Sequence, residues 1–204
     1  MGKYHQFLTA IREVRQRFAY VQDTREIARL AAMVAPAEVI IEIGSREGGS
    51  LCVLSRALVP GGLIIGVDLP GVLGKWGIPG SASHLAESAE LVRKDGHRCE
   101  IIIGDSHDEA TLVRVREILG EDTLADLVFI DGDHTLEGVR EDWRMYGHLG
   151  RVVAFHDINE YGGQMAVQTF WRELREEHPS RCREMIQNSG SKLLGIGVIE
   201  QAEE

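Results

Sequence analysis

Short β-branched apolar runs alternate along the chain with longer segments that carry an apolar residue every three or four positions. This alternation predicts five strands, each followed by an amphipathic helix. The predicted strands are Val39 to Ile43, Leu63 to Val67, Cys99 to Ile103, Leu127 to Ile130 and Val152 to Phe155. The predicted helices are Ser50 to Leu58, Ala82 to Lys94, Glu109 to Leu119, Thr135 to Tyr146 and Gln164 to Glu177.

Both ends of the chain depart from this alternation. Residues 1–36 predict two helices that end at Pro36, and these would pack on the domain, form a lid or contact another copy. Arg183 to Gln187 and Leu193 to Ile199 predict a closing antiparallel hairpin. We therefore expect a single α/β domain over residues 37–204, with a doubly wound, seven-stranded and mostly parallel sheet.

Composition narrows the class of protein. The chain has 204 residues, 44% of them hydrophobic, and a net charge of −10 without a Lys/Arg run, which disfavours nucleic acid as a partner. Met1 to Ala10 lacks the apolar centre of a signal peptide, and no stretch is long and apolar enough for a membrane span. Three scattered cysteines indicate buried free thiols, so we expect a cytoplasmic protein without membrane contact.

The Val39 to Ile43 strand is followed by a glycine-rich turn that contains Gly44, Gly48 and Gly49. Such a turn lets a ligand approach the backbone, and the helix that starts near Ser50 offers free N–H groups to an anion. The spacing does not match the G-x-G-x-x-G turn of dinucleotide-binding proteins. A βα turn that binds no ligand is the alternative.

Polar residues lie at or directly after the ends of all five predicted strands. They are Glu42 with Gly44, Asp68, Asp105 with Ser106, Asp131 with His134, and His156 with Asp157. Carboxylates gathered at one edge of a sheet repel one another unless a cation or a polar ligand lies between them. For any one of them, a helix N-cap is the alternative.

This order of motifs resembles the class I S-adenosylmethionine (SAM)-dependent methyltransferases, and within them the divalent-metal-dependent small-molecule O-methyltransferases. The catechol type, the macrolide-sugar type and the cephalosporin-hydroxylase-like group are the nearest. The resemblance covers roughly Ile40 to Asp157 and rests on Glu42-x-Gly44, Asp68, Gly104-Asp105-Ser106, Asp131-Gly132-Asp133-His134 and His156-Asp157. It implies a Rossmann-like methyltransferase fold.

The resemblance also implies roles in cofactor binding. Gly44, Ser45 and Ser50 would approach the methionine part of SAM, and Glu42 would organise the turn or meet the amino group. Asp68 would hold the ribose hydroxyls, since a carboxylate accepts two donors at once. The residues bordering the adenine would be Asp105, Ser106 and His107, and Asp131 would border the cofactor as well.

The resemblance further implies a metal site and a base. Asp131 and Asp157 would bind a divalent metal, of which Mg²⁺ is the first expectation and Mn²⁺ or Fe²⁺ the others. His156 or Asn159 would be the third ligand; for His156 and Asp157 to reach one ion, the strand must bend between them. His134 would be the general base, unless it caps the helix that follows.

Together these features predict a metal-assisted O-methyltransferase that acts on a hydroxyl of a small molecule, such as a sugar or natural product. The acceptor pocket would include the Lys75-Trp76 loop and the Asn159 to Gly163 loop with Tyr161. A metal-independent methyltransferase, a nucleotide-binding oxidoreductase and a non-catalytic SAM-binding protein are the alternatives. Assembly as a homo-oligomer stays open.

Overall fold

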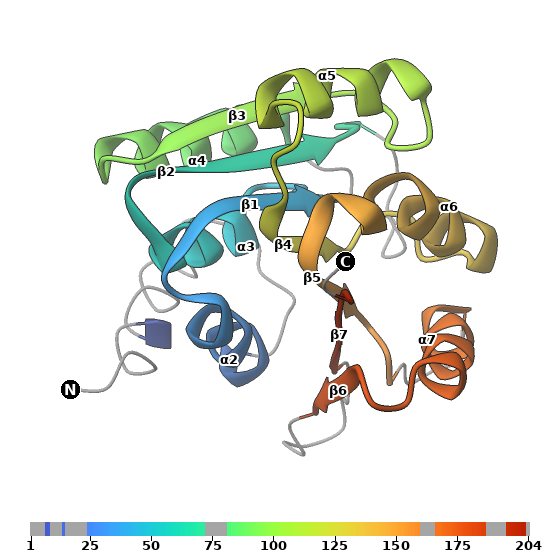
Figure 1. Ribbon diagram of the computed structural model, residues 1–204. Helices are drawn as coiled ribbons and strands as arrows, with labels where there is room; N and C mark the ends of the chain where they lie inside the picture. The colour runs from blue at the N-terminus through green and yellow to red at the C-terminus, as the bar shows by residue number, and fades with distance from the viewer. Residues whose placement is uncertain are drawn as a thin grey trace.

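The structure, a computed structural model, describes residues 7–8, 14, 24–71, 81–159, 166–186 and 195–202. In this part of the chain one seven-stranded sheet carries helices on both faces (Figure 1). The strands are β1 (Ala37–Ile43), β2 (Leu58–Asp68), β3 (Arg98–Ile103), β4 (Ala125–Ile130), β5 (Gly150–His156), β6 (Cys182–Met185) and β7 (Ile196–Glu200). The helices are α2 (Thr24–Val34), α3 (Gly49–Leu54), α4 (Ala82–Lys94), α5 (Glu109–Leu119), α6 (Leu136–Tyr146) and α7 (Ala166–Glu177), with short 3-10 turns η1 (Ser55–Ala57) and η2 (Gly147–Leu149).

The strands lie in the order β3-β2-β1-β4-β5-β7-β6. The first five are parallel, and β7 runs antiparallel to both of its neighbours. The predicted doubly wound, mostly parallel sheet with a closing antiparallel pair is therefore confirmed. Because the winding direction reverses between β1 and β4, a ligand is expected beyond the carboxyl ends of these two strands.

Strand residues alternate between two apolar layers, one on each side of the sheet. Ile40 and Phe129 pack with residues of α2, α3 and α4 on one face. Ile41 and Ile130 pack with residues of α5, α6 and α7 on the other face. This double burial explains why the parallel strands are nearly continuous apolar runs in the sequence.

The predicted boundaries are least accurate between α3 and β2. The helix expected to reach Leu58 ends at Leu54, and η1 leads directly into the strand. The Pro60-Gly61-Gly62 run, a sequence typical of turns, lies inside β2, where the register against β1 jumps over four residues. The apolar residues keep a helical spacing up to Leu58, where the chain is already extended. Apolar periodicity alone cannot mark where a helix ends and a strand begins.

Several sequence predictions lie outside the described residues. Among these are most of the N-terminal helices, the Lys75-Trp76 loop and Tyr161 with its neighbours. Within the described ranges, every helix is too short or too polar to cross a membrane.

Candidate active site

The glycine turn after β1 has no room for a side chain at its first position. Gly44 has a φ of 90°, and a Cβ there would overlap with the carbonyl oxygen of Asp131. The backbone N–H groups of Gly44 and Ser45 donate to the carbonyl of Val67, at 2.9 and 3.2 Å. The backbone of the turn thus packs directly against the ends of β2 and β4, a close approach that only a residue without a side chain allows.

Glu42, two residues before this turn, is fully buried. Burial raises the pKa of its carboxyl group to about 8, although the nearby hydroxyls of Ser50 and Ser45 oppose the rise. Neither carboxylate oxygen completes a hydrogen bond to another described residue. The group is therefore mostly protonated at pH 7, and a cationic group brought in by a ligand would favour its ionised form.

Asp68 ends β2. Burial raises the pKa of its carboxyl group, although hydrogen bonds from the backbone N–H groups of Arg46 and Leu69 oppose the rise. Leu69, the next residue, is 44% exposed. Sequence reasoning missed Leu69, although an apolar residue directly after a rim carboxylate was a readable signal. A carboxylate can accept hydrogen bonds from two hydroxyls, and exposed apolar surface can pack against a base, so this pair of features suits a nucleoside.

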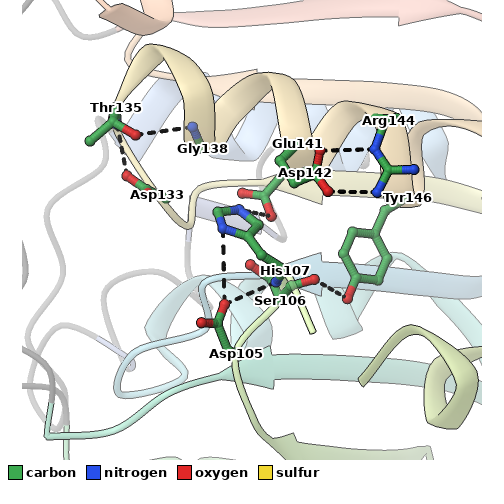
Figure 2. A network of polar contacts seen from close by, with 10 residues as sticks. All are labelled: Asp105, Ser106, His107, Asp133, Thr135, Gly138, Glu141, Asp142, Arg144 and Tyr146. Atoms are coloured by element: carbon green, nitrogen blue, oxygen red, sulfur yellow. Dashed lines mark hydrogen bonds and ion pairs between the residues drawn. The ribbon is translucent and has the colours of Figure 1, made fainter. Parts of the chain in front are cut away.

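Asp105, Ser106 and His107 form the loop after β3 (Figure 2). Asp105 Oδ1 accepts a hydrogen bond from the backbone N–H of His107 at 2.9 Å, and the Ser106 carbonyl accepts one from Tyr146 at 2.8 Å. The N-cap of α5 is Asp108, so helix capping does not account for Asp105 or Ser106. The structure places this loop at the same rim as Asp68, because the Gly104 N–H that precedes it donates to the Asp68 carbonyl at 3.0 Å.

Four side chains from the ends of β4 and β5 meet near the glycine turn. His156 Nδ1 lies 3.1 Å from Asp131 Oδ1 and 3.2 Å from Asp157 Oδ1. His134 Nδ1 lies 3.2 Å from Asp157 Oδ2, and its Nε2 lies 3.6 Å from Asp131 Oδ1. We call these four residues the His/Asp cluster: two carboxylates and two imidazoles alternate in a closed ring of contacts.

A backbone bend makes the His/Asp cluster possible. Asp157, directly after β5, has a φ of 62°, in the left-handed region that aspartate tolerates better than most residues. Neighbouring side chains of a strand normally point to opposite faces, whereas here His156 and Asp157 approach each other. Among the described residues, no hydrogen bond or ion pair joins the competing candidate, Asn159, to the cluster.

The His/Asp cluster supplies a cation to its own carboxylates. Burial alone would lower the pKa of His156, but the charge and hydrogen bond of Asp131, helped by Asp157, raise it to about 9. His134 is not a helix cap: that position belongs to Thr135, whose hydroxyl accepts from Gly138 N–H. As the side chains of the described residues stand, no group of three or more His, Cys, Asp or Glu is arranged to hold a metal ion.

Sequence reasoning also missed Asp142 on α6, which is fully buried near the β3 loop. The helix is rich in charged residues that are typical of a solvated face, namely Glu137, Arg140, Glu141 and Arg144. The overlooked signal was the spacing of Asp142 from Val139 and Tyr146, which places this acid on the apolar stripe of the helix.

Comparison with known proteins identifies the family. Residues 41–158, more than half of the chain, match the family described as "Methyltransferase domain". The chain belongs to this methyltransferase family. The matched segment nearly coincides with the stretch that carries the sequence resemblance, and it contains the glycine turn and the whole His/Asp cluster.

Solved structures share the fold of this methyltransferase. An O-methyltransferase from Bacillus cereus in complex with S-adenosylhomocysteine (SAH) has a TM-score of 0.61 and 17% identity, covering 98% of this chain and 91% of that one. TomG from Streptomyces achromogenes, an O-methyltransferase of tomaymycin synthesis in complex with SAM, has a TM-score of 0.59 and 17% identity, covering 99% and 91%. A proposed RNA methyltransferase from Pyrococcus horikoshii has a TM-score of 0.58 and 10% identity, covering 98% and 97%. No curated protein matches the sequence significantly.

Proposed function

We propose that this methyltransferase transfers the methyl group of SAM to a hydroxyl oxygen of a small molecule, assisted by a divalent metal. The observation that carries the proposal is the position of the His/Asp cluster, whose Asp131 carbonyl lies against Gly44 of the glycine turn. A group that can take up a proton therefore lies beside the place where the cofactor would bind.

His134 is the proposed general base. Its side chain is 21% exposed, more than those of the other three members of the cluster, and Asp157 orients it through Nδ1 at 3.2 Å. The Nε2 atom, which has the longer contact to Asp131, would take the proton of the acceptor hydroxyl. The oxygen then bonds to the methyl carbon, the carbon–sulfur bond breaks, and its electron pair stays on sulfur to give SAH.

On the cofactor side, each rim element has a proposed partner. The glycine turn with Ser45 and Ser50 would hold the methionine part of SAM, and Glu42 would face its ammonium group. Asp68 would accept hydrogen bonds from the ribose hydroxyls, while Asp105 and Ser106 would border the adenine. These assignments follow the order of the strands, with β1 and β4 at the reversal point and β2 and β3 farther out.

Asp131, Asp157 and His156 would hold the metal ion. Neighbouring ligands of an octahedral ion with bonds of about 2.1 Å lie about 3.0 Å apart, and His156 Nδ1 lies 3.1 and 3.2 Å from the two carboxylates. The donor set thus fits a dication that replaces the proton of His156 and opens the ring of contacts. When bound, the ion would lower the pKa of the acceptor hydroxyl.

A metal-independent reaction is the second candidate, and the charge balance of the cluster favours it. His156, with its pKa raised to about 9, already supplies a cation to the two carboxylates. In this version Asp131 and Asp157 only shape the site and orient His134.

The proposed acceptor is a sugar or natural-product hydroxyl, in keeping with the motif resemblance and with the role of TomG in tomaymycin synthesis. The fold alone does not separate this class from an RNA acceptor, since a proposed RNA methyltransferase shares it. The net charge of −10 disfavours a polyanionic acceptor.

The test measures SAH release from SAM with a panel of hydroxylated sugars and natural products, before and after chelation with EDTA. We expect turnover with at least one acceptor and its loss on chelation, restored by Mg²⁺ or Mn²⁺. Release only with amines, thiols or RNA would contradict the proposed acceptor class. Full activity after chelation would contradict metal assistance and support the metal-independent reaction.

Metal binding is measured separately from activity by titrating Mn²⁺ in electron paramagnetic resonance. The wild type is expected to bind one ion, and Asp157→Asn to lose it because one carboxylate ligand is gone. Asp122→Asn, which changes an exposed turn carboxylate, is the matched control and should bind as the wild type does. Equal Mn²⁺ binding by all three proteins would place the ion elsewhere.

A further inference from the structure

Asp142 is a buried acid that has no role in the site described above. Asp142 lies in the middle of α6 with a fully buried side chain. Burial raises the pKa of its carboxyl group to about 6. The Ser106 side chain, the charge of His107 and the backbone N–H of Asp133 each oppose the rise. Because the group still titrates below neutral pH, the fold carries a buried negative charge on a helix face that is otherwise apolar.

The first neighbour of this charge is the loop after β3. His107 Nε2 lies 3.2 Å from Asp142 Oδ1, and the His107 ring stands between Asp142 and Asp105 (Figure 2). One helical turn farther along α6, the hydroxyl of Tyr146 donates to the Ser106 carbonyl at 2.8 Å. Two buried residues of α6 therefore hold consecutive residues of this loop.

The second neighbour is the turn after β4. A Cβ at Gly132 would come within 3.1 Å of Asp142 Oδ2, so the turn packs directly on the carboxylate. The backbone N–H of Asp133 favours the ionised form of the same group. Asp142 thus lies behind two loops at the carboxyl edge of the sheet, the β3 loop and the start of the Asp131 to His134 segment.

We propose that Asp142 is a positioning residue for cofactor binding. Asp142 fixes the Ser106-His107 loop and the Gly132 turn at the distance from each other that the adenosine end of SAM requires. Asp142 touches no substrate in this account and acts through the two loops. The proposal rests on the SAM-dependent family and on this geometry, and it does not require the hydroxyl acceptor or the metal.

A contribution to stability alone does not explain this residue. A buried carboxylate pays for its desolvation, and neither oxygen of Asp142 completes a well-formed hydrogen bond to another described residue. An amide or an apolar side chain would fill the same space without that cost. A buried charge with a desolvation cost, placed against two loops at the carboxyl edge of the sheet, is the arrangement expected of a group kept for function.

The test compares Asp142→Asn with the wild type in three measurements: SAH affinity by calorimetry, urea unfolding, and amide hydrogen exchange at residues 105–108. The amide introduced by Asp142→Asn would carry no charge to pair with His107, so the β3 loop would be held less firmly. We therefore expect SAH to bind about tenfold more weakly to Asp142→Asn. Exchange at residues 105–108 should rise, while the unfolding midpoint stays the same or increases.

Glu176→Gln is the matched control. It changes an exposed carboxylate on α7, away from the β3 loop, and should leave all three measurements unchanged. If Asp142→Asn does not fold, Asp142→Ser, which removes the carboxylate and leaves a smaller polar side chain, takes its place in the test. SAH affinity within twofold of the wild type in the folded variant would overturn the proposal.

Discussion

The two halves of the site treat buried carboxylates in opposite ways. Under the glycine turn, Glu42 has two hydroxyls nearby and no described cationic partner, and its pKa rises to about 8. At the ends of β4 and β5, Asp131 and Asp157 surround His156, and the pKa of that imidazole rises to about 9. One half keeps a neutral acid, whereas the other keeps ionised groups of both signs.

This difference indicates what each half lacks. A neutral buried acid gains its charge only when a cation arrives, which agrees with the role proposed for Glu42 beside the ammonium of SAM. In the His/Asp cluster, the cation of His156 offsets part of the charge of the two carboxylates, and the proposed contribution of the cluster is to hold and move a proton next to the cofactor. Binding and chemistry should therefore be separable by mutation.

The largest expected effect comes from His134→Ala. Loss of the general base should lower the rate of methyl transfer by about 10²- to 10⁴-fold. The affinity for SAH should stay within about twofold of the wild type, because the cofactor residues lie on the other half of the site. Single-turnover rates and SAH calorimetry measure the two quantities, and a fully active variant would remove His134 from the mechanism.

A smaller effect is expected from Glu42→Gln, on the pH dependence of stability. Between the unfolded pKa of 4.5 and the folded value of about 8, folded Glu42 keeps a proton that the unfolded chain has lost. The free energy of unfolding of the wild type should therefore fall as the pH rises through this window, by at most about 1.4 kcal/mol per pH unit. The variant should lack this contribution.

Urea unfolding at pH 5 and pH 6.5 isolates the contribution of Glu42. His156 titrates between 6.5 and about 9 and thus contributes mainly above this range. Asp142 titrates between 3.8 and about 6 in both proteins, so its effect cancels in the comparison. The wild type should lose up to about 2 kcal/mol more than Glu42→Gln. Parallel pH profiles would show that Glu42 is ionised in the folded state.

Most of the fold could be predicted from the sequence, because strands buried on both faces are apolar runs and the helices between them are periodic. The order of strand-end motifs also indicated which residues would share the rim, since parallel strands end at one edge. The Asp131 to His134 segment and the His156-Asp157 pair were identified in this way.

What the sequence could not predict depends on backbone conformation and on burial. The left-handed φ of Asp157 turns two neighbouring side chains toward one point, and an alternating pattern gives no sign of it. The pairing of Asp142 with His107 joins residues from two elements that are not adjacent in the chain. The break in register within β2 likewise arises from pairing with β1 and not from local sequence.

The measurement that tests the central claim most directly is SAH calorimetry at pH 7 in buffers of different ionisation enthalpy. Binding at the glycine turn should ionise Glu42, so the wild type should release about one proton per SAH bound. Glu42→Gln should bind more weakly and release almost none. No binding of SAH by the wild type, or the same proton release from both proteins, would contradict the account.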